Sequence, residues 1–256
     1  MTTPSDGAWL STAVAIILLA SVAVVGLRTF RVPSPMAPLL ALGRATLQLS
    51  ILSVVLAGII DNPWWVGIAL AVMFLAAVTT TARRVHAPAA HWGVLAASMA
   101  TGSIVALVVV FATGAIEFSP RYVLAVGGIW IGNTMTIATL SSRAFTASVR
   151  DHWSEVEAWL SLGARPSQAV RSFAREAART ALIPSIDQTR TTGLVVLPGA
   201  FVGAIFGGAS PLEAGRFQLV VLAGVLAAGT LTAVLLLRAI GDLSTRPGPP
   251  DGVPSE

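Results

Sequence analysis

Long apolar stretches alternate with short, mostly polar connections along this chain. A helix needs roughly 20 apolar residues to cross the hydrocarbon core of a bilayer, which is about 30 Å thick. The first stretch lacks a basic segment before it and is too long for the apolar part of a secretory signal, so we interpret it as a permanent helix. We therefore predict an all-α membrane protein with seven transmembrane helices, at about residues 8–27, 39–60, 63–82, 92–114, 121–142, 191–207 and 217–237.

Arginine is distributed unequally between the two sides of this predicted bundle. Thirteen of the 16 basic residues fall in the first, third and fifth connections and after the last span, whereas Arg121 and Arg216 lie on the other side and Arg44 lies within the second span. Cytoplasmic loops of membrane proteins carry the excess of basic residues. We therefore expect the N-terminus outside and the C-terminus in the cytoplasm. Residues 1–240 are expected to form one transmembrane domain, followed by a disordered Pro/Gly-rich tail at 241–256.

The composition agrees with a membrane fold and excludes several kinds of chemistry. Hydrophobic residues make up 55% of the chain and charged residues 11%, against about 25% charged residues in a soluble domain. The chain has no Cys, which excludes disulfides, iron–sulfur clusters and a catalytic thiol. All its basic residues are Arg, so it has neither a Schiff-base lysine nor the lysine of a phosphate-binding loop. Any ATP hydrolysis would therefore belong to another subunit.

The connection at 143–190 is too long for an unstructured loop in a compact protein. Residues 153–162 have the spacing of a short amphipathic helix that ends at Gly163, and Pro166 is typical of the first turn of a second helix. The sequence thus predicts a cytoplasmic coupling loop that contains two short helices.

The second of these helices carries a basic ridge. Arg171, Arg175 and Arg179 follow one another at intervals of four residues and so share a face. Such a ridge fits a helix lying along an anionic leaflet, and it also fits contact with an acidic partner. Because no aromatic side chains are interleaved with the ridge, we do not expect nucleic-acid binding.

The first helix contains the segment Glu157-Ala-Trp-Leu-Ser-Leu-Gly163. It resembles the E-A-A-x-x-x-G motif of ATP-binding-cassette (ABC) permeases, matching at Glu157, Ala158 and Gly163, while Trp159 replaces the second Ala. In that motif a short helix and its Gly turn dock into a groove on a separate ATPase subunit. The same residues also fit an ordinary helix C-cap with Gly163 in the left-handed conformation, and the two interpretations are compatible.

Charged and polar residues inside the second span are candidates for a transport pathway or its gate. Arg44 and Gln48 are one turn apart and share a face. Asp187, expected near the cytoplasmic side, is a candidate counter-ion for Arg44, and it could instead pair with Arg190, three residues further on. Membrane anchoring and helix packing explain Arg44 and Gln48 equally well.

A polar patch at 133–136 lies in the middle of the fifth span. An amide in hydrocarbon needs a partner, so Asn133 should face another helix or a cavity. Asn133 and Met135 are therefore candidate pathway residues, with helix packing as the alternative. The three His residues are all predicted in cytoplasmic connections, and the sequence shows no recognisable high-affinity metal site.

The sixth span carries three glycines at intervals of four, Gly199, Gly203 and Gly207, after Pro198. Small residues at this spacing favour close helix packing, and a proline kinks a helix because it lacks the backbone N–H. We expect these residues to form a packing seam, within one subunit or across a dimer, and a hinge.

From about residue 8 to 240 the chain resembles the FetB-type iron-export ABC transporter permease family, in the order and spacing of the stretches Gly43-Arg-Ala-Thr-Leu-Gln48, Gly132-Asn-Thr-Met135, Leu160-Ser-Leu-Gly-Ala164, Ala181-Leu-Ile-Pro184, Asp187 and Thr192-Gly-Leu-Val-Val-Leu-Pro-Gly199. The resemblance implies a homodimeric subunit of the inner membrane that binds no cofactor. It also implies two copies of an ATPase partner that bind ATP and Mg, and export of iron or a related metal.

Two other interpretations differ in substrate or in class. Plant members of the same family, implicated in aluminium tolerance, have been linked to a nucleotide sugar, so a permease for such a solute is the alternative substrate. A non-enzymatic seven-helix sensor is the alternative class. An intramembrane enzyme is disfavoured because no predicted span contains a His or a clear acidic pair.

Overall fold

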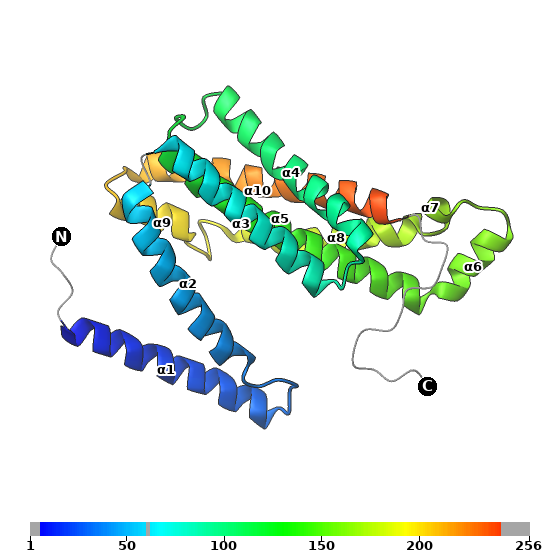
Figure 1. The fold of residues 1–256 in the computed structure, drawn as a ribbon, viewed down its shortest axis with the longest axis horizontal. Helices are drawn as coiled ribbons and strands as arrows, with labels where there is room; N and C mark the ends of the chain where they lie inside the picture. The colour runs from blue at the N-terminus through cyan, green and yellow to red at the C-terminus, as the bar shows by residue number, and fades with distance from the viewer. Residues whose placement is uncertain (1–5, 60–61, 242–256) are drawn as a thin grey trace. The chain divides into compact units, whose positions relative to one another are not determined.

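The computed structural model describes residues 6–59 and 62–241 of the chain, and within these ranges it is helical, with one isolated β-bridge and no strand. Figure 1 shows the helices in chain order. They are α1 (Asp6–Thr29), α2 (Ala37–Ile59), α3 (Pro63–Arg84), the 3₁₀ turn η1 (Ala89–His91), α4 (Trp92–Ala112), α5 (Pro120–Asp151), α6 (Trp153–Ser161), α7 (Pro166–Ala169), α8 (Arg171–Thr191), α9 (Gly199–Phe206) and α10 (Pro211–Ile240). The predicted tail lies, from residue 242 on, outside the described residues.

The chain separates into two compact units, Met1–Ile60 and Asp61–Glu256. In the first unit α1 and α2 pack against each other as a helical hairpin joined by residues 30–36. Ala20 and Val24 are buried, whereas large apolar side chains such as Leu19 and Val22 are exposed. An apolar helix with so much exposed apolar surface is typical of a membrane span.

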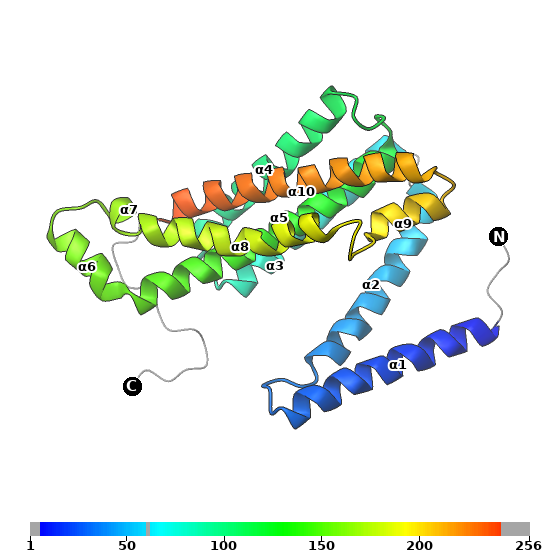
Figure 2. The ribbon, with the colours of Figure 1, turned by 180° about the vertical axis from the view of Figure 1, so that it is seen from behind.

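The second unit is built around α5, the longest helix, which contacts α3, α4, α8 and α10 (Figures 1 and 2). Three of its helices begin in the same way, with a polar cap followed by Pro at the first helical position. Asn62 Oδ1 accepts from Trp64 N at 3.0 Å before α3. Ser119 caps α5, and Ser210 caps α10 in a reciprocal arrangement with Glu213. Such caps satisfy the free N–H groups of the first turn.

Small residues let the long helices of the second unit approach closely. Trp130 of α5 donates from Nε1 to the carbonyl of Val221 at 3.2 Å, and its indole lies directly against Gly224 of α10. Gly102 of α4 meets α10 in the same way: a side-chain carbon there would lie 2.5 Å from the carbonyl oxygen of Ala228. These close approaches, and the absence of side chains at the glycines, define the helix contacts of this unit.

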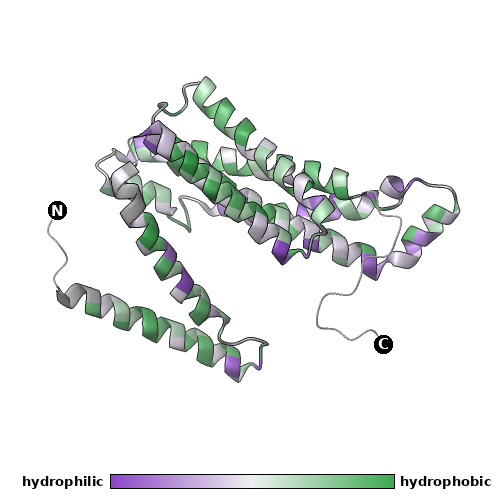
Figure 3. Cartoon of the chain, viewed as in Figure 1, coloured by the Kyte–Doolittle hydropathy of each residue, from purple (hydrophilic) through white to green (hydrophobic). Residues whose placement is uncertain are grey.

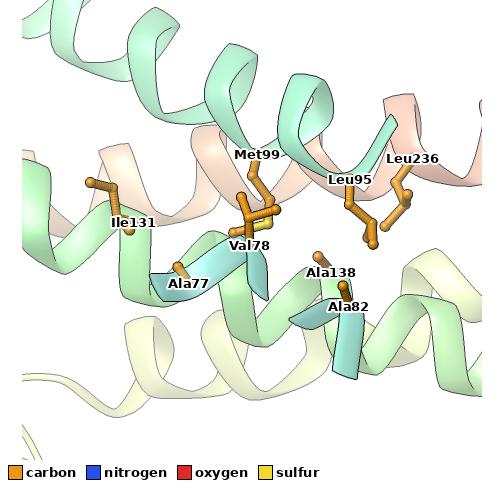
Figure 4. Close-up of a cluster of buried hydrophobic side chains, with 8 residues drawn as sticks. All are labelled: Ala77, Val78, Ala82, Leu95, Met99, Ile131, Ala138 and Leu236. Atoms are coloured by element: carbon orange, nitrogen blue, oxygen red, sulfur yellow. The ribbon is translucent and has the colours of Figure 1, made fainter. Parts of the chain in front are cut away.

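A compact apolar core joins α3, α4, α5 and α10 (Figure 4). The side chains converge from all four helices, and Met99 of α4 is fully buried among them. The cluster consists of Ala77, Val78, Ala82, Leu95, Met99, Ile131, Ala138 and Leu236. Its register shows that α3, α5 and α10 run in one direction and α4 runs in the other, because Ala82 and Leu236, late in their helices, meet Leu95 at the start of α4.

Five helices are long and apolar enough to cross a membrane, counted over the described residues: Leu10–Thr29, Pro63–Arg84, Ala89–Ala112, Pro120–Asp151 and Pro211–Ile240. They correspond to five of the seven predicted spans. The second predicted span corresponds to α2, whose apolar described stretch, Ala37–Ser53, is shorter. Figure 3 shows hydrophobic residues along most of these helices and hydrophilic ones on α6 and α7, at helix ends and within α2.

The sixth predicted span, at 191–207, is not a continuous helix. Residues 192–198 form a compact turn, and only Gly199–Phe206 is helical. The turn is held by its own backbone, since the carbonyl of Thr191 accepts from Val195 N at 2.9 Å and Gly193 N donates to the carbonyl of Val196 at 2.9 Å. Pro198 therefore stands at the N-cap of α9 and interrupts the helix instead of kinking it.

The predicted coupling loop at 143–190 is helical almost throughout. α5 continues beyond the predicted span to Asp151, and α6 and α7 lie where two short helices were expected. The helix is interrupted at Val170, so the expected second helix is divided into α7 and the long helix α8. α8 then packs lengthwise on α5 and α10, which leaves its basic ridge exposed on the opposite side.

Candidate functional site

The candidate coupling element is a protrusion at one end of the second unit, formed by α6, α7 and the turn between them (residues 153–170), which we call the α6–α7 protrusion. This end is rich in arginine. Arg143 of α5 donates from Nη2 to the carbonyl of Arg84, the last residue of α3, at 2.8 Å. The eight residues of α5 that follow Arg143 extend about 12 Å past the end of α3. The α6–α7 protrusion therefore stands beyond the bundle of long helices.

The α6–α7 protrusion is fastened to the bundle by one buried cluster. Val156 of α6 is fully buried, and it belongs to a group contributed by the ends of α5, α8 and α10. The members are Phe145, Val149, Val156, Ala169, Val170, Ala177 and Leu237. Because four helices and the short α7 share this cluster, a displacement of α6 must move with the ends of the long helices.

The motif residues of α6 take part in two separate local interactions, a side-chain hydrogen bond at Glu157 and a helix C-cap at Gly163. The carboxylate of Glu157 accepts from Trp153 Nε1 at 2.7 Å, one turn away on the same helix, and Ala158 is exposed. Gly163 has φ +86°, and it donates from N to the carbonyl of Leu160 at 2.9 Å. Ala164 N donates to the carbonyl of Trp159 at 3.1 Å, which completes a Schellman C-cap. The predicted C-cap is confirmed.

The tip of the α6–α7 protrusion exposes apolar side chains. Trp159 is 51% exposed and Leu162 is 81% exposed, three residues apart beside the Gly163 turn. An exposed aromatic residue next to an exposed leucine, surrounded by polar residues, is typical of a protein contact site.

The polar patch in the middle of α5 is divided between different faces of the helix. Asn133 faces α8 and α10: its Nδ2 donates to Ser185 Oγ at 3.3 Å, and its Oδ1 lies against Gly229. Met135 packs instead against the core shared by α3 and α4. Since successive helix residues are about 100° apart, neighbours in sequence need not share a face. Asn133 Oδ1 is buried and accepts no hydrogen bond from the described residues.

Asp187 lies farther from the arginine-rich end, measured along the axis of the bundle, than the sequence suggested. α8 runs antiparallel to α5, because Ala177 meets Phe145, Ala181 meets Ile137 and Ser185 meets Asn133. Asn133 is about 20 Å from the start of α5 and about 15 Å from Arg143 along the helix axis. Asp187, two residues beyond Ser185, is therefore near the middle of the long helices and not at the arginine-rich end.

Asp187 lies beside Arg190, one of its two predicted partners. Asp187 Oδ1 and Arg190 Nη1 are 3.6 Å apart, and the two side chains are 58% and 76% exposed. Arg44 and Gln48 lie one turn apart with exposed side chains on α2, in the first unit. Asp187 and Arg190 thus form a charged pair on the outer side of α8.

The glycines of α9 do not form a packing seam within the described part of the chain. A side-chain carbon at Gly199 or Gly203 would meet nothing within 4 Å, and one at Gly207 would meet only carbonyls of its own helix. The seams inside the second unit lie elsewhere, at Gly102 and Gly224. Each stands in a run of small residues at intervals of four, Ser98-Gly102-Ala106 on α4 and Gly224-Ala228-Thr232 on α10, a signal that the sequence analysis missed.

The described residues contain no group of three or more His, Cys, Asp or Glu side chains that could hold a metal ion. Oxygen-bearing side chains inside the described bundle, such as Asn133 and Ser185, are isolated amides and hydroxyls, and the Asp187 carboxylate lies on the outer side of α8. Among the described residues these groups are not clustered as the ligands of a high-affinity metal site are.

Three proteins with known names are similar to this chain in sequence. The chain is 37% identical over 200 residues to "UPF0014 membrane protein STAR2" of Oryza sativa subsp. japonica, covering 77% of this chain and 70% of that one. It is 32% identical to "Protein ALUMINUM SENSITIVE 3" of Arabidopsis thaliana, over 76% of this chain and 72% of that one. It is 34% identical to "Probable iron export permease protein FetB" of Escherichia coli (strain K12), over 54% of this chain and 53% of that one.

No solved structure matches the chain. The family match covers nearly its whole length, from residue 9 to 242, and its description is "Uncharacterised protein family (UPF0014)". The long apolar helices and the names of these relatives agree on a multi-pass membrane location. The chain therefore belongs to the UPF0014 family of membrane proteins, which includes a relative named as a probable iron export permease.

Proposed function

We propose that this chain is the permease subunit of an ABC exporter, powered by a separate ATPase subunit and working as a homodimer. The observation that carries the proposal is the α6–α7 protrusion, which exposes Trp159 and Leu162 at its tip while Val156 ties it to the ends of the long helices. A rigid element of this kind transmits movement from the ATPase subunit to the long helices, and from the long helices to the ATPase subunit. ATP and Mg would be bound and used by the partner.

The orientation follows from the same element. An ATPase that uses cellular ATP must meet the α6–α7 protrusion in the cytoplasm, so the arginine-rich end of the bundle is cytoplasmic, as the distribution of Arg also indicates. The N-terminus is then outside and the C-terminus inside, in the inner (plasma) membrane. The path from α8 through the turn at 192–198 to α9 replaces the sixth predicted span and keeps the number of crossings odd.

The proposed cargo is iron or a related metal ion. Support comes from the relative named as a probable iron export permease. The scattered oxygen ligands of the bundle are compatible with a cation that passes through without being retained. A nucleotide sugar is the competing cargo.

The coupling role is tested by removing the apolar tip. Leu162→Ala combined with Trp159→Ala should weaken binding of the ATPase subunit by about thirtyfold, because exposed aromatic anchors contribute most at protein contacts. The matched control is Leu75→Ala on α3, where the side chain is 63% exposed on a membrane-crossing helix. Equal ATPase binding by the tip variant, the control and the unaltered chain would contradict the coupling role.

The cargo is tested with the same complex in lipid discs. ATPase activity is measured with Fe²⁺, other divalent cations and nucleotide sugars in turn. Stimulation by Fe²⁺ supports metal export. Stimulation by a nucleotide sugar alone would retain the permease and replace the metal. If no ATPase subunit binds, the sensor interpretation takes the place of the permease.

A further inference from the structure

One side of α8 carries charge where the helix runs deep in the bundle. Ile183, Asp187 and Arg190 follow one another at intervals of four and three residues, so they form one line along the helix, which we call the α8 stripe. All three are exposed, and the opposite side of α8 is buried through Ala181 and Ser185. The α8 stripe therefore faces away from α5 and α10.

The depth of the α8 stripe makes its exposure unfavourable in lipid. Ser185 bonds to Asn133 in the middle of α5, and Asp187 and Arg190 lie about 3 and 7.5 Å further along α8, still beside the apolar part of the bundle. Charged side chains at such a depth face protein or water in membrane proteins, because hydrocarbon cannot solvate them. The α8 stripe must therefore face protein or water in the working protein.

We propose that a second copy of this chain covers the α8 stripe, with the two α8 helices meeting at the two-fold axis of the dimer. The inference rests on the proposed homodimer and names its surface. A two-fold axis along the bilayer normal brings the same residue of both copies to the same depth. Each Asp187 is then one turn from its own Arg190 and from the partner copy's Arg190.

Charge complementarity favours this occupant. Two Asp187 carboxylates and two Arg190 guanidinium groups form a neutral network. Each charge faces its like-charged counterpart at the same depth and lies one turn from two charges of opposite sign. The length of the Arg side chain, 76% exposed here, allows it to span one helical turn to the partner. An apolar partner would leave both charges of each copy buried without a new counter-charge, which is less favourable than burying them as a network.

The first experiment uses the absence of Cys in the chain, which makes single-cysteine variants unambiguous. Ile183→Cys is placed in the α8 stripe, and Ile104→Cys on α4 is the matched control. Ile104 is an isoleucine of similar exposure, 56% against 41%, close to the contact of α4 with α10. The complex with its ATPase subunit is treated in membranes with a short, permeant bis-maleimide.

A covalent dimer from Ile183→Cys, with none from Ile104→Cys, is the expected result. Equal cross-linking of the two variants would overturn the proposal. So would rapid modification of Cys at 183 by a charged, water-soluble thiol reagent without cross-linking, because that result means water covers the stripe. Co-purification of the ATPase is measured in the same samples, so a failed dimer surface is distinguished from a failed permease.

The second experiment changes the charges in the Ile183→Cys background. Asp187→Arg places four like charges at the axis and should lower the cross-linked fraction about a hundredfold, since like charges at an interface are strongly unfavourable. The exchange Asp187→Arg with Arg190→Asp restores opposite charges and should restore the cross-link. If the exchanged protein binds the ATPase normally but does not cross-link, or if Asp187→Arg leaves the cross-link unchanged, the proposal is wrong.

Discussion

Asn133 of α5 donates a hydrogen bond from Nδ2 to Ser185 Oγ of α8, 3.3 Å apart, across 52 positions of the sequence. This contact joins α8 to the middle of α5. It shows that a helix with charged residues at both ends runs beside the middle of a membrane-crossing helix instead of lying outside the bundle. The depth of the exposed Asp187–Arg190 pair along the bundle follows from that placement.

Ser185→Ala should destabilise the second unit by about 1 kcal/mol, since hydrogen bonds between membrane helices contribute modestly. The loss leaves both polar atoms of the Asn133 amide without a side-chain partner. The measurement is the thermal unfolding midpoint in detergent. Thr136→Ala is the control, because that exposed hydroxyl donates only to Gly132 of its own helix. Equal unfolding midpoints for the two variants would show that the interhelical bond contributes nothing.

Gly224→Ala should destabilise the protein by about 1–3 kcal/mol or prevent its accumulation, because the new side chain overlaps the indole of Trp130 in a packed core. Gly203→Ala should leave stability unchanged or slightly raised, since nothing lies within 4 Å of the added carbon. Expression level and unfolding midpoint check both. Destabilisation by Gly203→Ala of the same size would place a partner against α9.

Gly163→Val should uncouple ATP hydrolysis from transport while the subunit stays folded. A β-branched residue at φ +86° costs about 1–2 kcal/mol, and the end of α6 must change direction to relieve it. The assay compares cargo-stimulated and basal ATPase activity of the complex. Gly93→Ala, at an open helical position in the first turn of α4, serves as the control and should behave like the unaltered chain.

Single cysteines should report opposite sides of the membrane. Ser161→Cys at the end of α6 is expected to react with an impermeant thiol reagent only after the membrane is opened. Phe118→Cys, where the native side chain is 77% exposed before α5, should react in intact cells. The reverse pattern would invert the orientation derived from the distribution of Arg. The unaltered chain, which has no Cys, is the blank.

Local patterns predicted the features that depend on neighbours along the chain. Five helices long and apolar enough to cross a membrane, the C-cap at Gly163 and the helix start at Pro166 all follow from periodicity and from the conformations available to Gly and Pro. The sequence predicted a disturbance in the sixth span at Pro198, but as a kink within a continuous helix. Instead, Gly193 at φ +85° and the backbone bonds to Thr191 close a turn before α9 begins.

The amino-acid sequence by itself determined the membrane class of this protein, its helical elements and its distribution of charge, because burial in lipid and helix capping act on consecutive residues. Only the tertiary structure decided that Asn133 and Met135 face different helices, that Trp130 packs against Gly224, and that Asp187 lies at nearly the same depth along the bundle as Asn133. Those relationships join segments far apart in the chain, and they are decided by which helix faces pack most closely, a property that no local pattern encodes.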